Sequence, residues 1–62
     1  MLFPEFTENT ETGVNMYFAP GDKTENELIK ELESVYYCYS AVGTVKRDGK
    51  TYVVLTVDDE NS

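Results

Sequence analysis

The 62-residue chain lacks histidine and tryptophan, and it contains a single cysteine, Cys38. One cysteine cannot form a disulfide within the chain, and without histidine there is no Cys/His set for a structural zinc. Histidine is also the usual proton carrier near neutral pH. We therefore expect no metal, no cofactor and no catalytic activity.

Long apolar runs are missing as well, and segments such as YVVL hold only a few residues. A membrane-spanning helix needs about twenty apolar residues, and a signal peptide needs a basic start and an apolar stretch that MLFPEF does not supply. A lone thiol suits a reducing compartment. We expect a soluble, cytoplasmic protein that makes no contact with a membrane.

Basic residues are scarce, with five against twelve acidic residues and a net charge of −7. This charge repels nucleic acid phosphates and attracts basic proteins. Three of the five cations flank the turn at Asp48, which gives a small basic tip on an acidic body. The balance predicts no direct binding of nucleic acid and favours a basic protein as the partner.

Motifs for enzyme chemistry are equally absent. The segment APGDK lacks the spacing of a phosphate-binding loop, and the acidic tail lacks the turn glycine and alternating ligands of a calcium loop. Cys38 is expected late in a helix, where the helix dipole disfavours a thiolate. A small residue at the edge of the core is the better interpretation of Cys38.

The middle of the chain predicts a strand followed by a helix. Apolar and polar residues alternate over 14–19, which indicates a half-buried strand, and Pro20 and Gly21 end it. Thr24 and Glu27 have the spacing of a capping box. Apolar residues then recur at helical spacing and predict a helix over 24–39: Leu28, Ile29, Leu32, Val35, Tyr36 and Tyr39.

The last third predicts a β-hairpin, with strands over 41–47 and 50–57. Asp48 and Gly49 form the dipeptide that most readily adopts the two-residue turn matching antiparallel strands. This loop fixes the register, so that Val45 faces Tyr52 and Gly43 faces Val54 on one side of the sheet.

These elements predict one small α+β domain of βαββ order over 13–57, with one amphipathic helix on one face of an antiparallel, hairpin-containing sheet. Residues 1–12 show no strand or helix period, and we expect an irregular or mobile arm. Residues 58–62 form an acidic tail that we expect to fray.

Both faces of the predicted sheet are apolar, yet one helix covers only one face. Tyrosine can pack in a core or anchor an interface, and core packing is the better interpretation for Tyr36 and Tyr39. A partner is expected to bind residues left uncovered or acidic, which are Tyr17, Glu27, Glu31, Tyr37, Tyr52 and Val54.

The leading hypothesis is a non-catalytic, acidic protein-binding module. Such a domain could inhibit or regulate a basic nucleic-acid-processing protein, as DNA-mimic inhibitors of similar charge and size do. Two alternatives stay open. The chain could self-associate through the open sheet face, and the resulting oligomer could store a ligand. It could instead be an accessory subunit of a larger complex.

Overall fold

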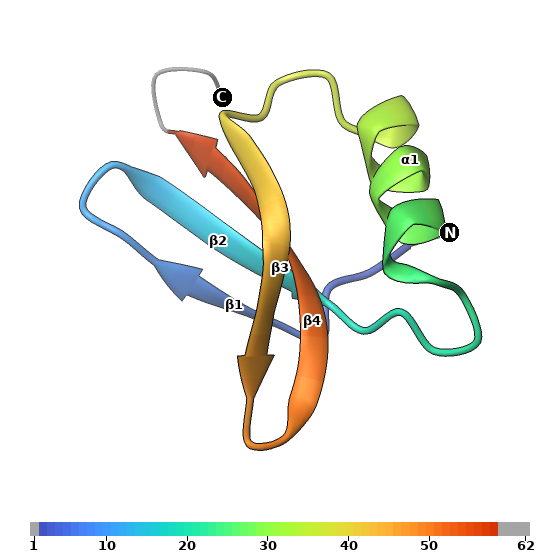
Figure 1. Ribbon diagram of the computed structural model, residues 1–62. Coiled ribbons are helices and arrows are strands. Elements are labelled where there is room, and N and C mark those ends of the chain that lie inside the picture. The colour runs from blue at the N-terminus through green and yellow to red at the C-terminus, as the bar shows by residue number, and fades with distance from the viewer. Residues whose placement is uncertain (1, 59–62) are drawn as a thin grey trace.

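The structure, a computed structural model, describes residues 2–58 and has two layers, a sheet and one helix (Figure 1). Four antiparallel strands form the sheet in the order β1-β2-β4-β3. The elements, in chain order, are β1 (Phe6–Asn9), β2 (Gly13–Phe18), α1 (Glu25–Val35), β3 (Ala41–Arg47) and β4 (Lys50–Asp58). The α+β class is therefore confirmed, while the element order is ββαββ.

Strand β1 corrects the prediction of an irregular arm over residues 1–12. Phe6 pairs with Tyr17 and Asn9 with Val14, so that β1 forms an edge of the sheet beside β2. Its sequence, FTEN, is short and holds one apolar residue, so it shows no alternation of apolar and polar residues typical of a strand. Its one apolar residue, Phe6, contacts two aromatic rings of the sheet, as described below.

Helix α1 begins as predicted and ends earlier. The Thr24 hydroxyl accepts from the Glu27 N–H, and the Glu27 carboxylate accepts from the Thr24 N–H, both at 3.1 Å. The last helical residue is Val35, and the predicted end at residue 39 is wrong. Aromatic residues, which favour extended backbone, follow Val35, and Tyr36 adopts extended dihedral angles.

The β3–β4 hairpin confirms the predicted register, with Arg47 paired to Lys50, Val45 to Tyr52 and Gly43 to Val54. Asp48 and Gly49 both have positive φ angles, 52° and 79°, as a type I′ turn requires. The fourth strand continues to Asp58, one residue beyond the prediction. Residues 59–62 of the predicted tail lie outside the described residues.

The core lies between α1 and the sheet. It consists of residues at most 2 % exposed, namely Phe18, Leu28, Leu32, Val53 and Leu55. Tyr36 and Tyr39 pack against this cluster, as expected, from the loop that follows the helix. No helix in the described part of the chain has the length and apolar character to cross a membrane.

Gly13 marks a close approach of two central strands. A Cβ atom at this position would collide with the backbone carbonyl oxygen of Val57 and lie 2.8 Å from the Asp58 Cα atom. Only glycine lets β2 begin beside the end of β4 without moving either strand.

Candidate functional site

The sheet face turned away from α1, here called the open face, carries three of the predicted partner-binding residues. Tyr17 pairs directly with Val54 across β2 and β4. The rings of Tyr17 and Tyr52 meet edge to face, with centroids 6.2 Å apart. The structure thus brings Tyr17, Tyr52 and Val54 together, while it places the other three predicted residues elsewhere.

Tyr17 is nevertheless only 5 % exposed, because the chain itself covers it. The Phe6 ring stacks on Tyr17 with centroids 4.4 Å apart, and it meets Tyr52 edge to face at 5.4 Å. The Arg47 guanidinium lies over Tyr17, 4.8 Å from the ring centroid. The expectation that Tyr17 is left uncovered for a partner is therefore wrong.

Hydrogen bonds and an ion pair complete this aromatic cluster of Phe6, Tyr17 and Tyr52. The Tyr17 hydroxyl donates to Glu8 Oε1 at 2.6 Å. Arg47 Nη2 donates to both carboxylate oxygens of Glu8, at 3.0 and 2.9 Å, and to the Tyr17 hydroxyl at 3.2 Å. The Tyr17 hydroxyl thus has partners on both β1 and β3, and the ion pair joins β1 to β3 across the open face.

The same contacts shift the acidities of the groups involved. Hydrogen bonds from Tyr17 and then Arg47 hold the pKa of Glu8 below its ordinary value, because both stabilise the carboxylate. Donation to Glu8 raises the pKa of the Tyr17 hydroxyl. At neutral pH the carboxylate is therefore ionised and the phenol is protonated.

Beside the aromatic cluster, the open face has a shallow groove of about 350 Å³, here called the Gly43 groove. It exists because Gly43 has no side chain, and an added Cβ atom would meet nothing within 4 Å. Val45 at its side is 36 % exposed. The lining residues are Tyr17, Ala41, Val42, Gly43, Thr44, Val45, Val54 and Thr56.

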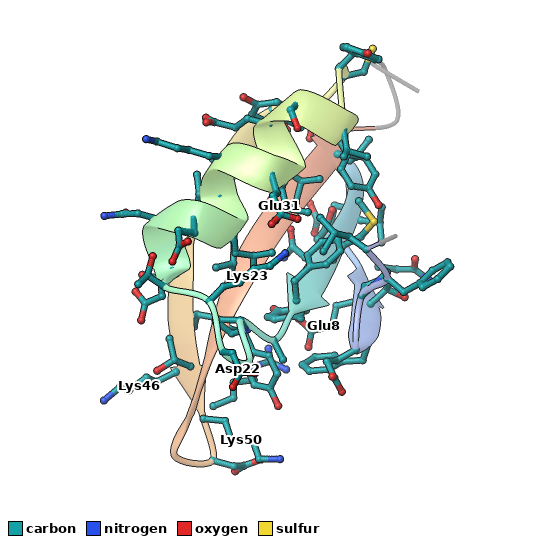
Figure 2. The ribbon with its side chains drawn as sticks, turned by 90° about the vertical axis from the view of Figure 1, so that its right-hand side faces the viewer. Glu8, Asp22, Lys23, Glu31, Lys46 and Lys50 are labelled. Atoms are coloured by element: carbon teal, nitrogen blue, oxygen red, sulfur yellow. The ribbon has the colours of Figure 1, made fainter. Side chains whose placement is uncertain are left out.

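The acidic residues of α1 lie in the other layer, away from the open face. Glu27 belongs to the capping box, and its hydrogen bonds with Thr24 lower the pKa of its carboxyl. Glu31 forms an ion pair with Lys23, and Figure 2 shows the two side chains close together below the helix. Both predicted contact residues thus already have partners within the chain.

Other carboxylates of this layer are more available. Asp22, Glu25 and Glu33 are exposed, and Glu33 accepts only a long hydrogen bond, 3.3 Å, from the Tyr39 hydroxyl. The segment 22–33 has five acidic side chains against two lysines. We call Asp22, Glu25, Glu27, Glu31 and Glu33 the acidic helix surface.

Tyr37 occupies a third location, the loop between α1 and β3, where it is 90 % exposed. Cys38 is also exposed in this loop, so its predicted place late in the helix is wrong. Among residues 2–58, no group of three or more acidic or cysteine side chains is placed to hold a metal ion.

Sequence reasoning missed Phe6, Glu8 and Arg47 as parts of the open face. One signal for Phe6 was present in the sequence. Tyr17 and Tyr52 were predicted on a sheet face without a helix, and their rings need apolar cover from another segment. The nearest unassigned aromatic residues, Phe3 and Phe6, were the candidates for that cover.

No protein-family model matches the chain, and searches among curated proteins and solved structures found no significant match.

Proposed function

We propose that the chain is a non-catalytic, acidic protein-binding module whose acidic helix surface binds a basic protein. The observation that carries the proposal is the segregation of charge. Five carboxylates and two lysines lie within residues 22–33, whereas the β3–β4 hairpin carries three cations and one acid over residues 41–50. The molecule therefore presents an acidic side and a small basic tip.

The geometry of α1 supports this choice of surface. Leu28 and Leu32 face the core, so the carboxylates on the remaining sides of the helix are free of apolar cover. Asp22, Glu25 and Glu33 accept no short hydrogen bond from another side chain within the described residues. Exposed charges of this kind accelerate association with an oppositely charged surface, and the rate falls as salt is added.

A protein that binds DNA or RNA is one basic partner class that this surface would suit. Carboxylates on a helix could occupy the positions that phosphates would take, which would make the chain an inhibitor or regulator of that partner. The open face does not contribute to this contact, because it lies on the other side of the sheet from α1 (Figure 1).

The test uses the purified chain as bait for basic proteins, with partners identified by mass spectrometry and affinities then measured by calorimetry. The test variant is Glu25→Gln with Glu33→Gln, which removes two charges from the acidic helix surface. Glu27 and Glu31 are left intact because the capping box and the Lys23 ion pair would otherwise change as well.

The matched control is Glu5→Gln with Glu11→Gln, which removes the same charge from two exposed residues outside the helix. We expect the helix variant to weaken binding at least about fivefold more than the control, with strong salt dependence. Equal weakening by the two variants would mean that net charge alone attracts the partner, and it would refute the proposed surface.

A further inference from the structure

Strand β3 forms one edge of the sheet and is unusually open for an edge strand. It is seven residues long, and every residue except Val42 is exposed. The other edge, β1, has only four residues and carries Glu8. Natural edge strands are usually kept from pairing by short length, proline, bulges or charge. The segment AVGTVKR contains neither proline nor an acid, and its charges lie only at its end.

The backbone of β3 offers a symmetric set of free groups. Residues that flank a two-residue turn form a hydrogen-bonded pair, and bonded and non-bonded pairs alternate along an antiparallel ladder. Arg47 and Lys50 flank the turn, so Arg47, Val45, Gly43 and Ala41 bond to β4.

The N–H and C=O groups of Val42, Thr44 and Lys46 therefore point away from the sheet. Thr44 lies midway between the other two. We propose that β3 pairs antiparallel with β3 of a second copy of the chain, with Thr44 on the two-fold axis. In this register Thr44 bonds to Thr44 of the second copy, and Val42 bonds to Lys46, so that every outward group of the three residues finds a partner.

Side chains on the open face fit the same register. Gly43 of one copy lies opposite Val45 of the other, twice by symmetry. The space above Gly43 is empty, and Val45 is partly exposed beside it. Directly opposed side chains on one face of a sheet pack together. Each copy thus supplies an apolar side chain beside the Gly43 groove of the other.

Charge complementarity also favours a second copy over a foreign strand. Lys46 points away from the body near the turn (Figure 2) and forms no ion pair within the described residues. In both views the C-terminal end of α1 and the start of β3 lie at the same end of the molecule. Pairing would bring Lys46 of one copy to Val42 of the other, near that end of its helix.

That end of the helix carries the exposed carboxylate of Glu33 and no basic residue in its last turn. The helix dipole adds negative charge there and favours a cation. The lysines of the two copies stay apart, because the strands run in opposite directions. A two-fold axis normal to the sheet would also place both helices on the same face of the joined sheet. The proposed pairing does not depend on the proposed function.

The test is the oligomeric state of the purified chain, measured by sedimentation equilibrium from about 10 μM to about 1 mM. We expect a monomer–dimer equilibrium, with concentration-dependent NMR shifts and amide protection at Val42, Thr44 and Lys46. A chain that stays monomeric throughout would overturn the inference, as would a dimer whose shifts lie on α1 or on the aromatic cluster.

Thr44→Pro removes an outward N–H without removing a bond to β4, and proline is tolerated at such edge positions. Thr7→Pro is the matched control. The Thr10 N–H donates to the carbonyl of Gly13, so by the same alternation Glu8 and Phe6 also bond to β2, and the Thr7 N–H points outward from β1. We expect Thr44→Pro to weaken dimerisation at least about tenfold, and Thr7→Pro to leave it unchanged.

A second pair of variants keeps the test decisive if Thr44→Pro does not fold. Lys46→Glu and Lys50→Glu change the net charge equally, but only Lys46 lies on the proposed interface. We expect Lys46→Glu to weaken dimerisation at least about fivefold more than Lys50→Glu. Equal effects would contradict the proposed register.

Discussion

Replacement of Phe6 by alanine tests whether the first strand is held by the aromatic cluster. Phe6 is half-buried, stacks on Tyr17 at 4.4 Å and meets Tyr52 at 5.4 Å. Truncation of a fully buried phenylalanine costs about 3–5 kcal/mol, and an aromatic pair adds about 0.5–1.5 kcal/mol beyond burial. Scaled to half burial, Phe6→Ala should lower the free energy of unfolding by about 2–3 kcal/mol.

This loss is large for a domain of 62 residues, whose total stability is expected to be about 3–9 kcal/mol. Urea unfolding followed by circular dichroism and tyrosine fluorescence measures it. Phe3→Ala is the matched control, because Phe3 is 74 % exposed and should change stability by less than about 0.5 kcal/mol. Equal, small effects of both substitutions would refute the role of Phe6 as the cover of the open face.

Two further predictions concern the core and the ion pair. Leu32→Ala should cost about 2–5 kcal/mol, because Leu32 is fully buried, and thermal unfolding should show a large fall in Tm. Because the pKa of Glu8 is lowered in the folded state, its contacts stabilise the fold at pH values above the ordinary pKa of glutamate. This stabilisation is lost as the pH falls through the lower pKa of the folded state. Glu8→Gln should therefore reduce the loss of stability between neutral pH and about pH 3 in urea titrations. An unchanged acid dependence would contradict this assignment.

The parts of the fold that the sequence predicted correctly have strong local causes. Asp48 and Gly49 select one turn type, and a two-residue turn leaves no freedom in the register of β3 and β4. The capping box of Thr24 and Glu27 likewise determines where α1 begins. These signals act over a few residues, so they can be recognised without knowledge of the tertiary structure.

The incorrect predictions concern elements whose bounds are determined by tertiary contacts. Strand β1 depends on Phe6 meeting rings that are distant in sequence, and its other residues, Thr7, Glu8 and Asn9, are polar. Helix α1 ends at Val35 although the apolar stripe continues, because Tyr36 and Tyr39 reach the core from a loop. A periodic pattern shows which residues are buried, but it does not show whether the backbone between them stays helical.

In the candidate site, too, local sequence patterns predicted some features, and others depended on the complete fold. Alternation along the strands correctly placed Tyr17, Tyr52 and Val54 on one face. The partners of Tyr17 and Glu31 within the chain were not predictable, because each depends on a side chain whose position is set by the complete fold. The partner of Glu27 was predictable, because the capping box with Thr24 is local in sequence. Which carboxylates are exposed and without a close partner therefore follows only from the complete fold.

The ion pair joins the two outermost strands through Glu8 and Arg47, two residues that are 39 positions apart in sequence. Edge strands ordinarily open first, and their amide hydrogens exchange through local fluctuations. Here β1 cannot separate from β2 unless the ion pair between Glu8 and Arg47, which lies on the opposite edge strand, also breaks. We expect the amides that join β1 to β2 to exchange by cooperative opening with the rest of the sheet, so that this small domain unfolds as one unit.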